Sequence, residues 1–455
     1  PALDGDERRV PSTWAGRPVP VRMSVPTALR ARDGVGTALV GLAAVTRVTA
    51  GALLGTSLAV HVGRTGSALE VSLLATAFSL GIILFAPVWG AFADVTGRRK
   101  LILVGTGLGA TLALMPLFAV DAAADAASAV LPIVVDPVWI QVLVRGLYAV
   151  FIAGFGPLML TVASERGGPG GRGKSIGSYN AFTAAGAGTG QFAAGLVLGA
   201  LVPGDVYVVV AGVSLLATVA VAFVDPGDTA PDPDADSLSR EVRSRLLPAA
   251  GERGHLSTNG LGWLYLGLSA RQATVSGVGA LMPVYIVTTL GLPEAWMGAV
   301  LAFNPVSQTA LMYYLGGVVD ERGRKPMITL GMAGSAAFGL VAAAAVFAPG
   351  GLAAAAVVAL GYVTLAVAFS AMWTGSVAFV GDVAPENRES ELMGLASTAR
   401  SVGGVVGPLG VGAVATVAGY PTAFAVASVL ALGAAAVVSV RVTESRPLVA
   451  DAGAA

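Results

Sequence analysis

The sequence has no cysteine, two histidines and few charged residues, and each shortage narrows what the chain can be. With no cysteine among 455 residues, disulfide bonds and thiolate chemistry are excluded. Charged residues make up 12% of the chain, whereas a soluble protein usually carries about 25%. His61 and His255 are far apart, and no cluster of His, Asp or Glu has the spacing of a metal site. The sequence also lacks the glycine-rich phosphate loop that direct use of ATP would need.

Hydrophobic residues make up 55% of the chain and gather in long runs between short polar connections. A run of about 20 apolar residues crosses a bilayer, and within lipid a helix satisfies its own backbone hydrogen bonds. We therefore predict an all-α integral membrane protein with twelve transmembrane helices. The predicted spans are residues 36–60, 67–93, 100–120, 136–164, 174–202, 205–224, 259–289, 293–319, 326–347, 351–380, 390–418 and 421–441.

The basic residues predict the orientation of the chain in the membrane. Of the 27 Lys and Arg residues, Arg64 alone lies in an odd-numbered connection, and four lie inside predicted spans. All the others lie in the even-numbered connections and the two terminal segments. Because basic connections stay in the cytoplasm, we expect both termini there, in a multi-pass protein of the cell (plasma) membrane of a prokaryote.

The sequence divides into two halves that repeat each other. The segment GAFADVTGRRK at 90–100 matches the segment around 317–325, and Arg47 matches Arg271 at nearly the same interval. We predict two pseudo-symmetric six-helix bundles with the solute site between them near the bilayer midplane. The expected domains are a cytoplasmic tail at 1–35, a bundle at 36–224, a cytoplasmic linker at 225–258, a second bundle at 259–441 and a cytoplasmic tail at 442–455.

The repeated segment resembles the signature loop of the major facilitator superfamily, G-x-x-x-D-x-x-G-R-[KR]-[KR], with Val95 where many members carry a basic residue. The resemblance covers residues 36–441. It implies that Asp94 contacts the start of the eleventh helix and that Arg98 reaches Glu165, in pairs that hold one conformation. The residues to which it gives this gating role are Gly90, Asp94, Gly97, Arg98 and Glu165, mirrored by Gly316, Asp320, Gly323, Arg324 and Asp382.

Glycines in the fifth and eleventh predicted helices bear on the direction of transport. Gly403, Gly407 and Pro408 resemble the glycine–proline motif of the superfamily, which marks drug and proton exchangers when it lies in the fifth helix. There, Gln191 takes the place of the proline and Gly186 and Gly190 persist. Small residues at this spacing indicate close helix packing more often than gating.

Four arginines, Arg47, Arg145, Arg271 and Arg400, lie inside predicted spans, and no Asp or Glu lies in the middle of a span. A charge at the centre of a membrane helix costs at least ~2.5 kcal/mol and so usually faces a watery cavity or a partner. The cavity should therefore be electropositive and favour an anionic solute, which guanidinium groups hold well.

Paired arginines in the first and seventh helices resemble the organic-anion branch of the superfamily, and would face each other across the cavity. The alternative is that they bond backbone carbonyls or reach the interface, as Arg400 does in one interpretation. The candidate substrate-binding residues are Arg47, Arg271, Arg145, Asn304, Gln308 and Gln191.

Together these features predict a secondary active transporter of a small solute, an organic anion, that works by rocker-switch alternating access as a monomer. The alternative is a proton-coupled multidrug or metabolite exporter of the same fold. We expect no enzymatic activity, no cofactor and no nucleic-acid partner. Its partners would be the bilayer, the solute and, where transport is coupled, a proton or an exchanged anion.

Overall fold

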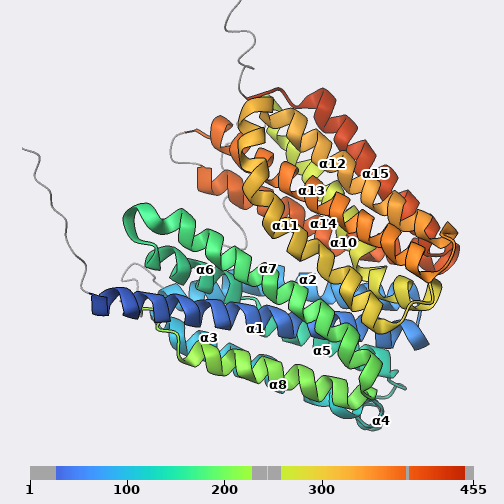
Figure 1. Ribbon diagram of the computed structural model, residues 1–455. Coiled ribbons are helices and arrows are strands. Elements are labelled where there is room, and N and C mark those ends of the chain that lie inside the picture. Colours follow the sequence, from blue (N-terminus) through green and yellow to red (C-terminus); the bar gives the residue numbers. More distant parts are fainter. Residues whose placement is uncertain (1–26, 228–242, 244–257, 386–388, 446–455) are drawn as a thin grey trace, which may run out of the picture.

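The computed structural model describes residues 27–227, 243, 258–385 and 389–445, and side chains throughout these ranges except 27–35, 169–170, 309–310, 312–320 and 389–390. These residues fold almost entirely into helices (Figure 1). The first half contains α1 (Thr27–Thr65), α2 (Ala68–Thr96), α3 (Arg99–Leu112), η1 (Met115–Ala119), α4 (Val120–Val130), α5 (Pro137–Ile152), α6 (Phe155–Arg166), α7 (Gly168–Ala200) and α8 (Pro203–Ala222). The second contains α10 (Leu261–Val284), η3 (Tyr285–Thr289), α11 (Glu294–Arg322), α12 (Arg324–Ala344), η4 (Ala345–Phe347), α13 (Gly351–Val383), α14 (Glu389–Ala418) and α15 (Tyr420–Arg441).

Ten segments of the described chain are long and apolar enough to cross a membrane, which confirms an all-α membrane protein. The predicted count of twelve is not confirmed in full. The predicted spans 259–289 and 293–319 are helical, as α10 with η3 and as α11, but they are not among the ten. The predicted tails and linker lie largely outside the described residues, although α1 already begins at Thr27, before the predicted span.

Two predicted spans are each built from consecutive helices. The third span continues from α3 through η1 into α4, with Pro116 at the start of η1. The fourth divides into α5 and α6 around Gly154, three residues before Pro157. A proline lacks the backbone N–H of a helical hydrogen bond, and its ring clashes with the preceding turn, which favours breaks at these two places. Pro87, Pro305 and Pro408, by contrast, lie inside helices that continue past them.

The two halves pack their helices in the same pairs. Helix α1 lies along α7 in the first half, and α10 lies along α14 in the second. Glycines permit both contacts: a Cβ at Gly186 or Gly190 would lie 2.6 Å from a carbonyl oxygen of α1, and one at Gly403 or Gly407 would overlap carbonyl oxygens of α10. The repeated glycines of the sequence are therefore packing positions in both halves.

The halves meet most closely at one end, where α7 converges on α11 (Figure 1). A Cβ on Gly195 would overlap the carbonyl oxygen of Glu294, and one on Gly412 would overlap Ser72. Arg64 and Glu294 form a salt bridge between the halves at this end. We call this end, defined by Arg64, Ser72, Gly195, Glu294 and Gly412, the closed end.

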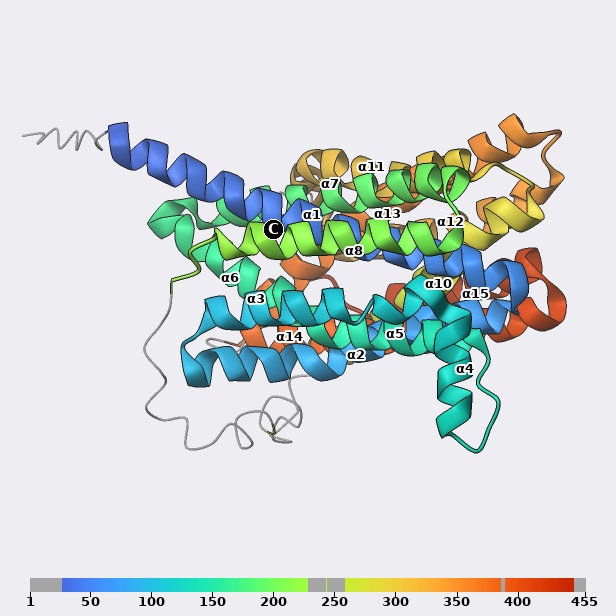
Figure 2. The same ribbon diagram turned by 90° about the horizontal axis from the view of Figure 1, so that it is seen from below.

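Two hydrogen bonds extend the junction from the closed end along α2 and α14. The backbone N–H of Leu69 donates to the Thr416 hydroxyl over 3.0 Å, and the Thr76 hydroxyl donates to the carbonyl oxygen of Val405 over 3.2 Å. The start of α1 lies at the opposite end of the molecule from α4, which projects from the bundle (Figure 2). The bundles diverge toward that opposite end, as Figure 1 shows.

The glycine contact predicts that Gly195→Ala opens the closed end. Overpacking costs about 1–3 kcal/mol, so the open population should rise about fivefold or more. Because the chain has no native cysteine, Ser72→Cys is a clean reporter, and Ser72 is fully buried beneath Gly412. We expect faster reaction of this cysteine with a water-soluble maleimide in detergent when Gly195→Ala is added.

The matched control is Gly105→Ala, since a Cβ at Gly105 meets nothing within 4 Å. Equal labelling rates with Gly195→Ala and Gly105→Ala would show that the closed end does not depend on the glycine contact.

Candidate solute site between the two halves

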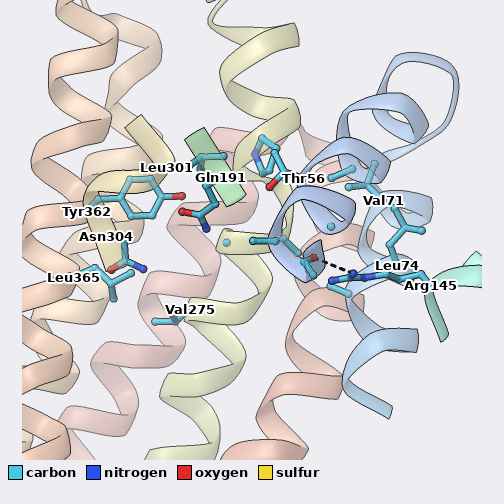
Figure 3. A pocket seen from close by; sticks show the side chains of 18 of the residues that line it. Thr56, Val71, Leu74, Arg145, Gln191, Val275, Leu301, Asn304, Tyr362 and Leu365 are labelled. Atoms are coloured by element: carbon cyan, nitrogen blue, oxygen red, sulfur yellow. Dashed lines mark hydrogen bonds between the residues drawn. The ribbon is translucent and has the colours of Figure 1, made fainter. Parts of the chain in front are cut away.

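A central cavity of about 290 Å³ lies between the two halves and is lined by residues of both (Figure 3). Its polar lining residues are Thr56, Arg145 and Gln191 from the first half and Asn304 and Tyr362 from the second. The remaining walls are apolar or glycine, including Val71, Leu74, Leu301 and Leu365. Among the described residues that line it, none is acidic and Arg145 alone is charged. The cavity is thus a small space with apolar and glycine walls and a few convergent hydrogen-bonding groups, as solute sites usually are.

Helix α5 presents Arg145 to this cavity, and the first half holds its side chain in place. Its Nη1 donates to the carbonyl oxygen of Gly51 over 3.2 Å, and its Cζ lies 4.1 Å from the centroid of the Phe78 ring. A Cβ on Gly55 would lie 2.8 Å from its Nη2, so the glycine leaves room for the guanidinium. One N–H of Arg145 is therefore used within the protein. Although only 9% of the residue is exposed, its remaining N–H donors lie at the cavity.

The facing side chains add polar groups that lack partners. Gln308 donates to the Asn304 side-chain oxygen over 2.8 Å, which leaves the Asn304 amide nitrogen as a donor. The Gln191 side-chain oxygen is buried without a hydrogen bond among the described residues. Tyr362 has no hydrogen bond to its hydroxyl in the described part of the chain, and Figure 3 shows this hydroxyl directed toward Gln191. The donors at this cavity outnumber its free acceptors, which suits a solute rich in acceptor oxygens.

The structure places Arg47 and Arg271 inside the bundles, so the expectation that they face each other across the cavity was wrong. Arg47 donates to the Ser214 hydroxyl over 3.1 Å and to the Thr218 hydroxyl over 2.9 Å, both on α8. Arg271 donates from Nε to the Ser335 hydroxyl over 2.8 Å. Neither lines the cavity, and they are 3% and 2% exposed. Hydroxyl groups at the same depth thus replace the acidic partner that the sequence lacks.

The loop that carries the first signature motif pairs Glu165 with Arg99 in place of the expected Arg98. The Arg99 Nη1 lies 2.9 Å from the nearer Glu165 carboxylate oxygen. The reason lies in the helix boundary: Gly97 has a φ of 66° and ends α2, Arg98 is an exposed residue between helices, and α3 begins at Arg99. The resemblance did not fix this one-residue difference.

In the second half, Arg324 is itself the first residue of α12, and its Nε donates to Asp382 over 3.2 Å. The carboxylate of Glu444 accepts from the backbone N–H groups of Arg324 and Lys325 over 3.1 and 3.0 Å. This contact caps the positive end of α12 from the segment after α15. The sequence pattern did not predict this contact, although Glu444, an acidic residue just after the last predicted span, was a visible signal.

The other predicted gating residues are only partly described. Asp94 is exposed on the last turn of α2 and makes further interactions. Gly90 lies in α2, and Gly323 separates α11 from α12 with a φ of 89°. Gly316 and Asp320 lie within α11, but their side-chain positions fall outside the described residues. No group of three or more His, Asp or Glu that could hold a metal ion occurs in the described chain.

The two similar bundles around a cavity have counterparts among known proteins. The sequence profile of the Major Facilitator Superfamily matches residues 40–365, and again residues 264–454. The chain belongs to this superfamily. Members of the Major Facilitator Superfamily are membrane transporters that bind small-molecule solutes, so the protein is a transporter by family. No curated protein matches the sequence.

Solved structures of other transporters share the fold of this superfamily member. A mutant of the nucleoside transporter NupG has a TM-score of 0.70 and 10% identity, over 89% of this chain and 99% of that chain. A bacterial homologue of the iron transporter ferroportin, in an inward-facing state, has a TM-score of 0.63 and 16% identity, over 90% and 97%. A mutant of the peptide transporter POT has a TM-score of 0.62 and 14% identity, over 89% and 93%. At these identities the likeness concerns the fold alone.

The placement of Arg47 predicts a structural role for it. We expect Arg47→Gln and Arg271→Gln to lower the free energy of unfolding by about 1–3 kcal/mol each, because buried charged hydrogen bonds are lost. Thermal unfolding in detergent measures this, with the exposed Arg98→Gln as the matched control. Solute binding per folded molecule should not change in Arg47→Gln, because Arg47 lies outside the cavity. A variant that unfolds at the wild-type temperature but no longer binds solute would contradict this role.

The pairing of Glu165 predicts that a double-mutant cycle detects Arg99 and not Arg98. Because Glu165 is half-exposed, we expect a coupling free energy of about 0.2–1 kcal/mol between Arg99→Ala and Glu165→Ala. The same cycle with Arg98→Ala should give a value near zero. Unfolding free energies of the single and double variants measure both cycles. A coupling confined to the Arg98 cycle would restore the pair that the motif implies.

Proposed function

We propose that this superfamily member transports a small organic anion through the central cavity, with Arg145 as its main charged contact. The observation that supports this best is that Arg145 lines the cavity without an acidic partner among the described lining residues. A guanidinium group with free N–H donors binds a carboxylate or phosphate in two parallel hydrogen bonds. Asn304, Gln191 and Tyr362 complete the polar part of this site. The protein would move this solute across the membrane unchanged.

We further propose rocker-switch alternating access, in which the two bundles tilt about the cavity. The closed end, held by Arg64 and Glu294, would face the outside of the cell, because the basic connections lie at the other end. Both termini would then be cytoplasmic, in a monomer in the plasma membrane. The contacts of the described residues correspond to an inward-facing state in this orientation.

The exporter alternative would couple transport to protons through a carboxylate in the cavity, and the described lining holds none. Glu70 and Glu294 lie at the closed end, and both are engaged there. Glu70 accepts from the backbone N–H of Ser67 at the start of α2, and Glu294 pairs with Arg64. We therefore favour uniport or anion exchange, neither of which needs a proton-binding group at the midplane.

The proposed function predicts that Arg145→Gln weakens anion transport. Purified protein in proteoliposomes would be tested for uptake and counterflow of labelled organic anions and phosphate esters. A hydrogen bond to a charged group contributes about 1.5–3 kcal/mol, so the apparent affinity should fall about tenfold or more. Gly55→Ala keeps the charge but fills the space beside Arg145 Nη2, and we expect a smaller loss of affinity.

Arg47→Gln serves as the matched control, since it removes a buried arginine that lies outside the cavity. Unchanged anion uptake by folded Arg145→Gln would overturn the proposed site. Transport of cations or neutral compounds with no transport of anions would overturn the solute class.

A further inference from the structure

A second cavity adjoins the central one on the side away from the closed end. It measures about 360 Å³ and lies between α2 of the first half and α10, α13 and α14 of the second. On α13, Leu365 lines the central cavity and Phe369 lines the second one. On α2 the corresponding residues are Leu74 and Phe78. Four residues are about one helical turn, so the two cavities lie in series along the same helices. We call the second cavity the access chamber.

Arg400 is the charged group of the access chamber. Its Cζ lies 4.0 Å from the centroid of the Trp373 ring, and Trp373 stacks nearly parallel with Phe369, at 13° and 6.0 Å between centroids. The face of the guanidinium is thus held against an aromatic wall, which leaves the N–H edge as its binding surface. Arg400 has no hydrogen bond or salt bridge to any described residue, and it is only partly buried.

The rest of the chamber supplies donors on one side and an apolar wall on the other. The side-chain oxygen of Gln272 accepts from Arg271 Nη1 over 3.4 Å, which leaves the Gln272 amide nitrogen as a donor. Arg271 therefore lies directly behind this wall and adds positive charge. Ser79 and Ser401 contribute hydroxyl groups, and Ile82 and Ile83 are apolar. The lining described for the chamber includes no acidic residue.

We propose that the access chamber is a second solute site, at which Arg400 holds the oxyanion group of a solute that also carries an apolar body. The oxyanion is a carboxylate or a phosphate, since both fit the edge of a guanidinium group. The apolar body lies against Ile82 and Ile83. The solute occupies this site on its way between the central cavity and the end opposite the closed end. This inference rests on the proposed function, because the same anion would use both sites.

Stoichiometry of binding tests the proposal. Equilibrium dialysis of the full-length protein in detergent would use radiolabelled benzoate as a carboxylate probe and phenyl phosphate as a phosphate probe. We expect two molecules bound per wild-type protein, one to Arg400→Gln, one to Arg145→Gln and none to the double variant. The affinity of the chamber should fall about tenfold or more in Arg400→Gln. Whichever probe binds there identifies the preferred oxyanion.

The matched control is Arg441→Gln, because Arg441 also stacks on a tryptophan, with its Cζ 5.4 Å from the Trp263 ring, but lies outside both cavities. It should still bind two molecules. Should Arg400→Gln fail to fold, Arg400→Lys and Gln272→Ala test the same site: each should weaken the second binding event and leave the first unchanged.

The possible failures are distinguishable. If the wild type binds one molecule, and if Arg145→Gln abolishes this binding while Arg400→Gln leaves it intact, the access chamber is not a solute site and the proposed function stands. If the wild type binds one molecule and only Arg400→Gln abolishes this binding, the central cavity is not a solute site and the access chamber is one. Binding of benzylammonium at the chamber as tight as that of benzoate would overturn its assignment to an oxyanion.

Discussion

The arrangement of the two cavities depends on a backbone-to-backbone contact between the halves at one end. Gly195 and Gly298 bring α7 and α11 together so closely that a Cβ on Gly298 would lie 2.8 Å from the carbonyl oxygen of Gln191. With this end held shut, helices that diverge from it must leave space between them farther along. The central cavity and then the access chamber occupy that space in order along α2, α10 and α13. Where the glycines lie thus decides at which end the space between the halves is closed.

The cost of a charge in lipid explains how the arginines are arranged around this space. Each of the four arginines inside the predicted spans contacts a polar or aromatic side chain, because no acidic residue lies at the same depth. Arg47 and Arg271 donate to hydroxyl groups, and their Cζ atoms lie 5.7 and 5.5 Å from the centroids of the Phe155 and Phe369 rings. Arg145 and Arg400 lie closer to a ring, at 4.1 Å from Phe78 and 4.0 Å from Trp373. A hydroxyl partner engages the donors, and a ring engages the face of the guanidinium and leaves its edge free. The two arginines that lie closest to a ring, Arg145 and Arg400, are the two that line cavities.

The sequence could predict features that depend on local sequence, but not features that depend on how the helices are rotated against one another. The membrane spans, the repeated halves and the alternation of basic connections follow from hydropathy and charge, and these are properties of local sequence. Arg145, Gln191 and Asn304 were proposed because polar residues inside spans are few, and they line the central cavity; Gln308, proposed on the same ground, does not line it and donates to Asn304. The prediction that Arg47 faces the cavity was wrong because the direction of its side chain depends on the rotation of α1 relative to α8. Ser214 and Thr218, one turn apart in the predicted span 205–224, were the signal that could have located its partner. The boundary between α2 and α3, at Gly97 to Arg99, decides which arginine pairs with Glu165, and it could be located only from the backbone geometry.

The proposed alternating access would also limit how strong the contacts at the closed end can be. A solute shifts a two-state equilibrium only by its differential affinity for the two states, and reversing a 1:99 ratio takes about 5.5 kcal/mol. The closed end has glycine contacts, two backbone–hydroxyl hydrogen bonds and the Arg64–Glu294 pair, whose side chains are 41% and 23% exposed. Such an ion pair contributes about 0–1 kcal/mol, and each hydrogen bond about 0.5–1.5 kcal/mol. Under the proposed function, the ion pair and the two hydrogen bonds together amount to about 1–4 kcal/mol, which is comparable with the about 1.5–3 kcal/mol of a hydrogen bond between the solute and Arg145.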